Sequence, residues 1–156
     1  MKRIIIWMLV AGGAFAAADD KDQDAKRLPE GAGKETVARL CMDCHDSGNF
    51  RKVRLSRDEW SDKVADMADR GAKGTEAELA AVVEYLARNF GPDAKVNVNT
   101  APMVELKTIL GIPAQQAQAV VDFREANGGF ERWQDLQKVP GVDGKKIEEK
   151  KDLMAF

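Results

Sequence analysis

Two cysteines and a histidine stand at a spacing that could attach a cofactor. The run Cys41-Met42-Asp43-Cys44-His45 holds both cysteines and the one histidine of this 156-residue chain. Thiols at this spacing can add across the vinyl groups of a haem while the adjacent imidazole binds the iron. A thioredoxin-type pair would need a βαβ setting, a disulfide would leave His45 without a role, and zinc would need a fourth ligand. The motif predicts one covalently bound haem c per chain, on Cys41, Cys44 and His45.

Because His45 is the only histidine, a second histidine cannot bind the iron, and the sixth position must go to methionine, water or a less usual ligand. Methionine supplies the soft thioether that haem iron accepts. Met42 lies inside the attachment loop, and Met103 and Met154 lie in a later part of the chain. We therefore expect Met67 to be the distal ligand, against the alternative of an ordinary core methionine.

Helical patterns flank the motif. Val37, Leu40 and Cys41 recur at helical spacing, and residues 49–55 have the composition of a loop. Ser56 or Arg57 is expected to open the next helix. Its predicted apolar face contains Trp60, Val64 and Met67. A capping box of Thr75 and Glu78 predicts a further helix, with the buried residues Leu79, Val82, Val83, Leu86 and Phe90.

Residues 34–92 resemble the small class I cytochrome c domains, particularly those of quinohaemoprotein dehydrogenases. The resemblance rests on the CxxCH motif, the W-x-x-x-V-x-x-M pattern from Trp60 to Met67, and Glu84-Tyr85-Leu86. It implies three helices around a haem, with His45 proximal and Met67 distal. The chain departs from that family in its brevity, because loop residues that normally cover one haem edge are missing.

A second helical unit follows the Gly91-Pro92 pair, which marks a domain boundary. Aligned with itself at an offset of thirty residues, this unit shows an internal duplication. The matched pairs are Leu106 and Leu136, Ile109 and Val139, Gly111 and Gly141, Ile112 and Val142, and Ala117 and Ile147.

Residues 96–156 resemble the helix-hairpin-helix domain of the competence protein ComEA family. The matching residues are Asn97-Val98-Asn99-Thr100-Ala101, Glu105-Leu106, Leu110-Gly111-Ile112, Phe123-Arg124, Gly128-Gly129-Phe130, Asp135-Leu136 and Val139-Pro140-Gly141-Val142. The resemblance implies that Gly111 and Gly141 let backbone amides approach DNA phosphates without reading bases. Lys145 and Lys146 follow the second hairpin and are further candidate phosphate contacts.

Charge argues against a strong pull toward DNA. Residues 95–156 contain nine basic and nine acidic side chains, whereas phosphate-binding domains usually carry a positive excess. This balance favours a docking module for a redox partner protein, with weak nonspecific DNA contact as the alternative.

The N-terminus has the features of an export signal. Lys2 and Arg3 precede a short apolar run, and Ala14-Phe15-Ala16 resembles a signal peptidase site. The run is too short to span a bilayer, so we expect a cleaved leader and no membrane span in the mature chain. Without Lys2 and Arg3, 22 basic side chains face 26 acidic ones, a formal charge of −4.

These features predict an all-α protein in four parts. Residues 1–18 form a signal peptide, 19–29 a flexible lead-in, 30–92 a cytochrome c domain around one haem, and 93–156 a ComEA-like helix-hairpin-helix domain. The predicted function is that of a periplasmic mono-haem c-type cytochrome. It would transfer single electrons as a carrier rather than an enzyme. The alternative is a periplasmic, competence-like, nonspecific DNA-binding protein that carries a haem domain.

Overall fold

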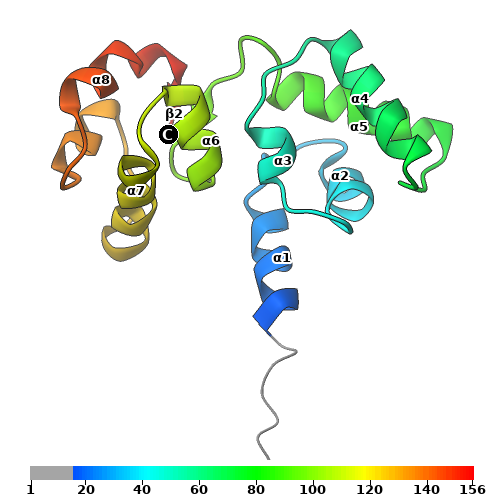
Figure 1. Ribbon diagram of the computed structural model, residues 1–156, viewed down its shortest axis with the longest axis horizontal. Helices are drawn as coiled ribbons and strands as arrows, with labels where there is room; N and C mark the ends of the chain where they lie inside the picture. The colour runs from blue at the N-terminus through cyan, green and yellow to red at the C-terminus, as the bar shows by residue number, and fades with distance from the viewer. Residues whose placement is uncertain (1–15) are drawn as a thin grey trace, which may run out of the picture.

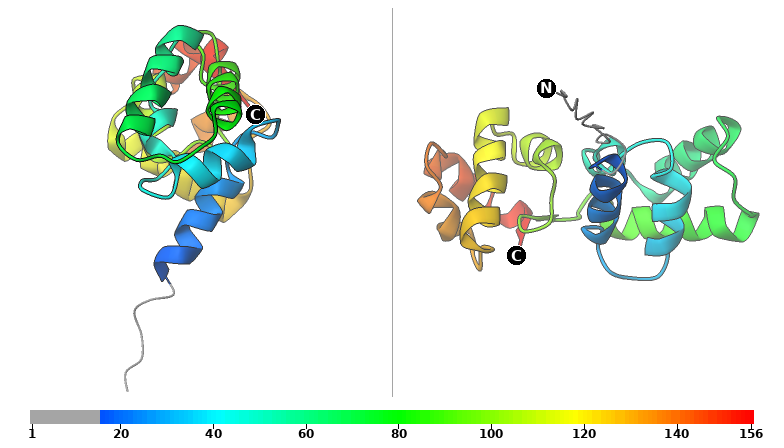
Figure 2. Two further views of the ribbon diagram at one scale, coloured as in Figure 1. Left: turned by 90° about the vertical axis from the view of Figure 1, so that its right-hand side faces the viewer. Right: turned by 90° about the horizontal axis from the view of Figure 1, so that it is seen from below.

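The computed structural model describes residues 16–156, so most of the predicted signal peptide lies outside the described residues. Helices dominate, as expected, and form two lobes joined by the segment around residues 90–97 (Figures 1 and 2). The first lobe contains α1 (Ala16–Lys26), α2 (Lys34–Cys41), α3 (Gly48–Arg51), α4 (Arg57–Asp69) and α5 (Glu76–Asn89). Within the described part of the chain, no helix has the length and apolar character needed to cross a membrane.

The second lobe is helical apart from one short sheet. It contains β1 (Val96–Asn97), α6 (Met103–Leu110), α7 (Ala114–Asn127), the 3-10 helix η1 (Trp133–Lys138), α8 (Gly144–Glu149), η2 (Lys151–Leu153) and β2 (Met154–Ala155). The two strands pair in parallel, Val96 with Met154 and Asn97 with Ala155. This pairing ties the end of the chain to the start of the lobe. It is a departure from the wholly helical unit that the sequence predicts.

The predicted helix starts at Ser56 and Thr75 are confirmed. Each side chain accepts a hydrogen bond from the backbone N–H three residues on, and the carboxylate of the glutamate there, Glu59 or Glu78, accepts one from the backbone N–H of the cap residue. These reciprocal bonds satisfy amides that a helix start otherwise leaves without partners. They fix where α4 and α5 begin, and the two helices then pack against each other.

The predicted flexible lead-in at residues 19–29 is wrong, because α1 covers most of it. The carboxylate of Asp24 accepts hydrogen bonds from the backbone N–H and the hydroxyl of Ser47, each at 2.7 Å. Just after α1, Leu28 is only 2% exposed in the core of the first lobe. Contacts to a distant segment order this charged stretch. Residues 48–51, expected in a loop, likewise form the short helix α3.

Each lobe has its own apolar core. The first extends from Leu28 to Phe90 and the second from Val96 to Met154. Residues matched in the duplication occupy equivalent places in the second core, because Leu106, Leu136, Ala117 and Ile147 are all fully buried. We propose that the two cores are separate domains with the predicted extents, residues 30–92 and 93–156.

A buried ion cluster joins the two lobes. Glu105 on α6 accepts hydrogen bonds from Arg51 Nε at 2.7 Å and from Arg54 Nη2 at 2.8 Å. The side chains of Arg51 and Glu105 are each 2% exposed, and that of Arg54 is 11% exposed. Breaking a buried ion pair by removing one partner is strongly destabilising, because it leaves a charge without compensation. Glu105 is therefore the residue whose loss should most weaken the contact between the lobes.

Replacing Glu105 with glutamine should lower the free energy of unfolding by about 3–5 kcal/mol, because two buried guanidinium groups lose their counter-charge. Urea titration followed by circular dichroism would measure this change. Glu84→Gln is the matched control: Glu84 pairs with Arg57 on the surface, where the side chains are 51% and 60% exposed. That control should cost less than about 1 kcal/mol. Equal losses in the two variants would contradict the structural role of the cluster.

Candidate functional site

The first predicted hairpin joins α6 to α7 through Gly111. This glycine ends α6 at φ 64° and ψ 29°, a left-handed conformation that glycine adopts without strain. A Cβ placed on Gly111 would meet no atom within 4 Å, so the backbone here faces open space. The next residue, Ile112, is 3% exposed and holds the turn against the core. The result is an exposed backbone turn on a fixed base.

The start of α7 follows this turn without a side-chain cap. Pro113 occupies the N-cap position and accepts no capping hydrogen bond, and Ala114 and Gln115 are exposed. The first amides of a helix lack partners within the helix and lie at its positive end, which favours an anion such as a phosphate. The α6–α7 hairpin can therefore contact a phosphate through its backbone alone.

The second hairpin shares the turn but not the free helix start. Gly141 has φ 80° and open space around its Cβ position. The Asp143 carboxylate, however, accepts hydrogen bonds from the backbone N–H groups of Lys145 at 3.1 Å and Lys146 at 3.3 Å. It satisfies those amides and adds a negative charge at the start of α8. Phosphate contact at this hairpin would depend on the exposed side chains of Lys145 and Lys146 rather than on its amides.

Hydrogen bonds of three motif residues, Asn99, Arg124 and Phe130, link the segment before α6 to α7 and to the segment after α7. Asn99 donates to the carbonyl of Phe130 at 2.8 Å and accepts from its N–H at 2.7 Å. Arg124 donates to the carbonyl of Val98 at 2.6 Å. Burial lowers the pKa of Arg124 to about 10, which still leaves it charged at neutral pH. Two of the linked residues, Arg124 and Phe130, are themselves buried.

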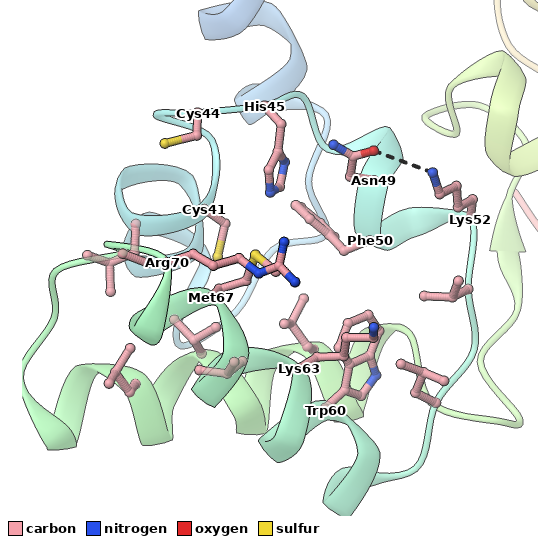
Figure 3. A pocket seen from close by; sticks show the side chains of 18 residues that line it. Cys41, Cys44, His45, Asn49, Phe50, Lys52, Trp60, Lys63, Met67 and Arg70 are labelled. Carbon is pink, nitrogen blue, oxygen red and sulfur yellow. Dashed lines mark hydrogen bonds between the residues drawn. The ribbon is translucent and has the colours of Figure 1, made fainter.

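The other predicted site residues meet in a pocket of the first lobe. Cys41 lies at the end of α2, Cys44 and His45 lie in the following turn, and Met67 lies on α4 (Figure 3). All four line one cavity of about 600 Å³. The four residues that the sequence grouped as one site, Met67 included, therefore line the same cavity. Met42 is instead buried in the core.

The two thiols of the pocket differ in environment. Both are free, and Cys44 is exposed, whereas Cys41 is partly covered. Burial raises the pKa of the Cys41 thiol to about 11, so this group is neutral at physiological pH. His45 Nδ1 lies 2.9 Å from the carbonyl oxygen of Asp46, and its ring is 6.4 Å from that of Phe50. Trp60 donates its indole N–H to the Phe90 carbonyl at 3.1 Å and so presents its ring to the cavity.

Comparison with known proteins identifies the second lobe. The family model described as a helix-hairpin-helix motif matches residues 92–154. ComE operon protein 1 of Bacillus subtilis is 41% identical over 58 residues, which cover 37% of this chain and 28% of that protein. An uncharacterized protein of Haemophilus influenzae is 36% identical over 63 residues, 40% of this chain and 56% of that protein.

A third similar protein is longer. The endonuclease/exonuclease/phosphatase family domain-containing protein 1 of Xenopus laevis is 44% identical over 57 residues, 36% of this chain and 10% of that protein. The chain thus spans between a tenth and somewhat over half of these three relatives. No solved structure matches. The ComEA-like part of the predicted resemblance is confirmed, and residues 92–154 form a helix-hairpin-helix domain.

The same comparisons correct the prediction of a c-type cytochrome. They identify a helix-hairpin-helix domain at residues 92–154, which supports the alternative prediction better than the main one, and they give no support to a cytochrome c fold, a covalently bound haem c, electron transfer or a redox partner. The physical reason for the error is that a five-residue spacing motif constrains only a short stretch of backbone. The match over residues 92–154, in contrast, specifies a whole domain.

Sequence reasoning also missed two groups of charged residues. Arg51, Arg54 and Glu105 are far apart in the chain and show no shared pattern, although Glu105 stands in the family motif. Lys52, Lys63 and Arg70 line the pocket beside the predicted residues. A signal for the last two was present, because Lys63 and Arg70 recur at helical spacing with Trp60 and Met67.

The cysteines should react at different rates with iodoacetamide at pH 8. With a pKa of about 11, only about 0.1% of Cys41 is thiolate at that pH, and the thiolate is the nucleophile. Cys44 is exposed and should be alkylated first. Reactivity of Cys41 should rise as the pH rises toward 11. Peptide mass spectrometry over time would measure both rates, with the urea-unfolded chain as control. Equal rates in the folded chain would refute the difference.

Proposed function

We propose that the chain is an exported, nonspecific DNA-binding protein whose helix-hairpin-helix domain contacts the phosphate backbone. The observation that carries this proposal is the α6–α7 hairpin. There an exposed left-handed Gly111 leads into a helix start without a side-chain cap, inside a domain that matches the helix-hairpin-helix family. Backbone amides can hold a phosphate but carry no information about bases. Binding should therefore not depend on sequence.

The charge of the domain limits the strength of this binding. Lys145 and Lys146 are exposed beside the second hairpin, but Asp143, Glu148 and Glu149 lie close to them in the chain. With equal numbers of basic and acidic residues, the domain gains little from long-range attraction to DNA. We expect contact with only two or three phosphates, at affinities of about 10⁻⁴ to 10⁻⁶ M at physiological salt.

Export is the second part of the proposal. The predicted leader at residues 1–18 supports it through its basic start, apolar run and small residues near Ala16. A periplasmic DNA-binding protein of this kind would have a binding role rather than a catalytic one. The similarity to ComE operon protein 1 supports the competence-like character of that role.

Changing Lys145 and Lys146 to glutamate should weaken binding to every duplex tested. Fluorescence anisotropy of the full chain with two unrelated labelled duplexes, over a range of salt concentrations, would measure it. The native slope of log affinity against log salt should be about −2 to −3, and the variant slope should be shallower by about 2. Lys26→Glu combined with Lys95→Glu makes the same charge change at exposed sites outside the hairpins. That control should bind nearly as the native chain does, and no binding by the native chain even at low salt would refute the proposal.

Replacing Gly111 with alanine tests the backbone contact directly. The left-handed conformation should cost about 1–2 kcal/mol of stability, because a Cβ is unfavourable there. No internal clash adds to this, because the space around Gly111 is open. The added methyl group would stand where a phosphate approaches, so affinity should fall while the fold persists. Gly71→Ala is the control, since Gly71 also has a positive φ and open space but lies in the other lobe. If both variants bind DNA alike, the Gly111 hairpin is not the contact.

A further inference from the structure

The proposed DNA binding does not account for the pocket of the first lobe. Its volume of about 600 Å³ lies within the range of small-molecule sites, roughly 300–1,000 Å³. Its walls come from α2, α3, α4, α5 and the segments between them. Buried apolar side chains of several helices form much of the lining: Phe50, Trp60, Val64, Val82 and Leu86.

Among the described residues, the charged side chains that line this pocket are all basic. Lys52, Lys63 and Arg70 line it, and none of its lining residues is an aspartate or a glutamate. Lys63 on α4 and Arg70, the residue just after its end, recur at helical spacing with Trp60 and Met67 and so lie on the same side. An amphipathic helix normally keeps its charges away from its apolar face. At α4 and its end, two cations stand beside the apolar side chains that line the cavity.

The positions of these cations suit a pocket mouth. Lys63 and Arg70 are exposed, and Lys52 is partly exposed, whereas the apolar lining beneath is buried. Long basic side chains can lay their apolar stems along a cavity wall and keep the charge in water. Figure 3 shows Arg70 reaching across the cavity from the end of α4, Lys63 lying beside Trp60, and Lys52 on the side of α3.

Local partners engage these cations only in part. Arg70 Nε lies 3.2 Å from the Asp66 carboxylate in a pair whose side chains are 70% and 45% exposed. Lys52 donates to the side-chain oxygen of Asn49 at 3.4 Å. Such exposed contacts are weak and leave the cations available to a ligand. The buried Cys41 thiol is neutral and adds no negative charge.

We propose that this pocket binds a small organic anion with an apolar body. The body would lie against Trp60, Val64 and Leu86, and the anionic group would lie at the mouth near Lys63 and Arg70. An uncharged apolar molecule would gain the burial but not the charge attraction, and an inorganic anion would gain only the weak attraction. The lining should therefore bind a molecule that has both an apolar body and an acidic group more tightly than a molecule that has only one of them.

The dye 8-anilinonaphthalene-1-sulfonate is a suitable anionic probe, and N-phenyl-1-naphthylamine is its uncharged counterpart. Titration of each dye into the full chain, followed by fluorescence, should give tighter binding of the anionic dye. Changing Lys63 and Arg70 to glutamine should lower the affinity for the anionic dye by about three- to tenfold and leave the affinity for the uncharged dye unchanged. Lys26→Gln with Lys95→Gln makes the same charge change elsewhere and should alter neither.

A second variant locates the dyes. Ala72 lines the pocket and is only partly buried, so Ala72→Trp should obstruct the cavity and weaken binding of both dyes. Circular dichroism would establish that the helices of this variant persist. The proposal fails if the native chain binds neither dye, if the uncharged dye binds as tightly as the anionic one, or if the Lys63 and Arg70 change has no effect. DNA affinity should stay unchanged in all these variants, so this test is independent of the DNA-binding proposal.

Discussion

The arrangement of the two lobes depends on the ion pairs that the Glu105 carboxylate forms with Arg51 and Arg54. The carboxylate stands between the two arginines in a setting from which water is nearly excluded. The arginines are also held by other groups: Arg51 donates to the Arg27 carbonyl at 3.1 Å, and Arg54 donates to that of Ala94 at 2.9 Å. Within the described residues, no buried polar side-chain atom lacks a hydrogen-bond partner. Buried charges are tolerated only when they are paired and hydrogen-bonded in this way.

The same ion cluster connects the pocket of the first lobe to the Gly111 hairpin of the second lobe. Phe50 lines the pocket, and the next residue, Arg51, bonds to Glu105. Glu105 lies on α6, which ends at the Gly111 hairpin. Both arginines also lie over the ring of Phe90, at 5.9 and 5.7 Å from its centre. The wall of the pocket and the first hairpin are therefore held in one frame, although the two sites lie in different lobes.

Local signals in the sequence were enough to predict where α4 and α5 begin. They failed where an element depends on contacts with a distant part of the chain. The capping residues Ser56 and Thr75 set helix starts through neighbours three residues away, so both were predictable. The position of α1 depends on the hydrogen bonds that Ser47 donates to the Asp24 carboxylate, and the ion cluster spans more than fifty residues of chain. Neither leaves a periodic pattern.

The residues predicted to form a haem site lie close together, but the function predicted for them was wrong. The spacing of Cys41, Cys44 and His45, with the elimination that left Met67, grouped four residues that line one pocket. It did not reveal the cations at the mouth, because charged residues on a helix are ordinarily assigned to its solvated face. The haem assignment was wrong because it rested on a short motif, whereas the domain-length match at residues 92–154 identified the second lobe correctly.

The difference between the two hairpins reconciles a neutral domain with the proposed phosphate binding. At α8, Asp143 supplies the anion that the helix start attracts, so its amides are already satisfied. At α7, Pro113 supplies none, and the exposed helix start retains its partial positive charge. That charge belongs to the backbone and is invisible to a count of lysines and aspartates. A domain with no net charge from its side chains can therefore still hold a phosphate, provided that the contact is short-ranged and confined to one turn.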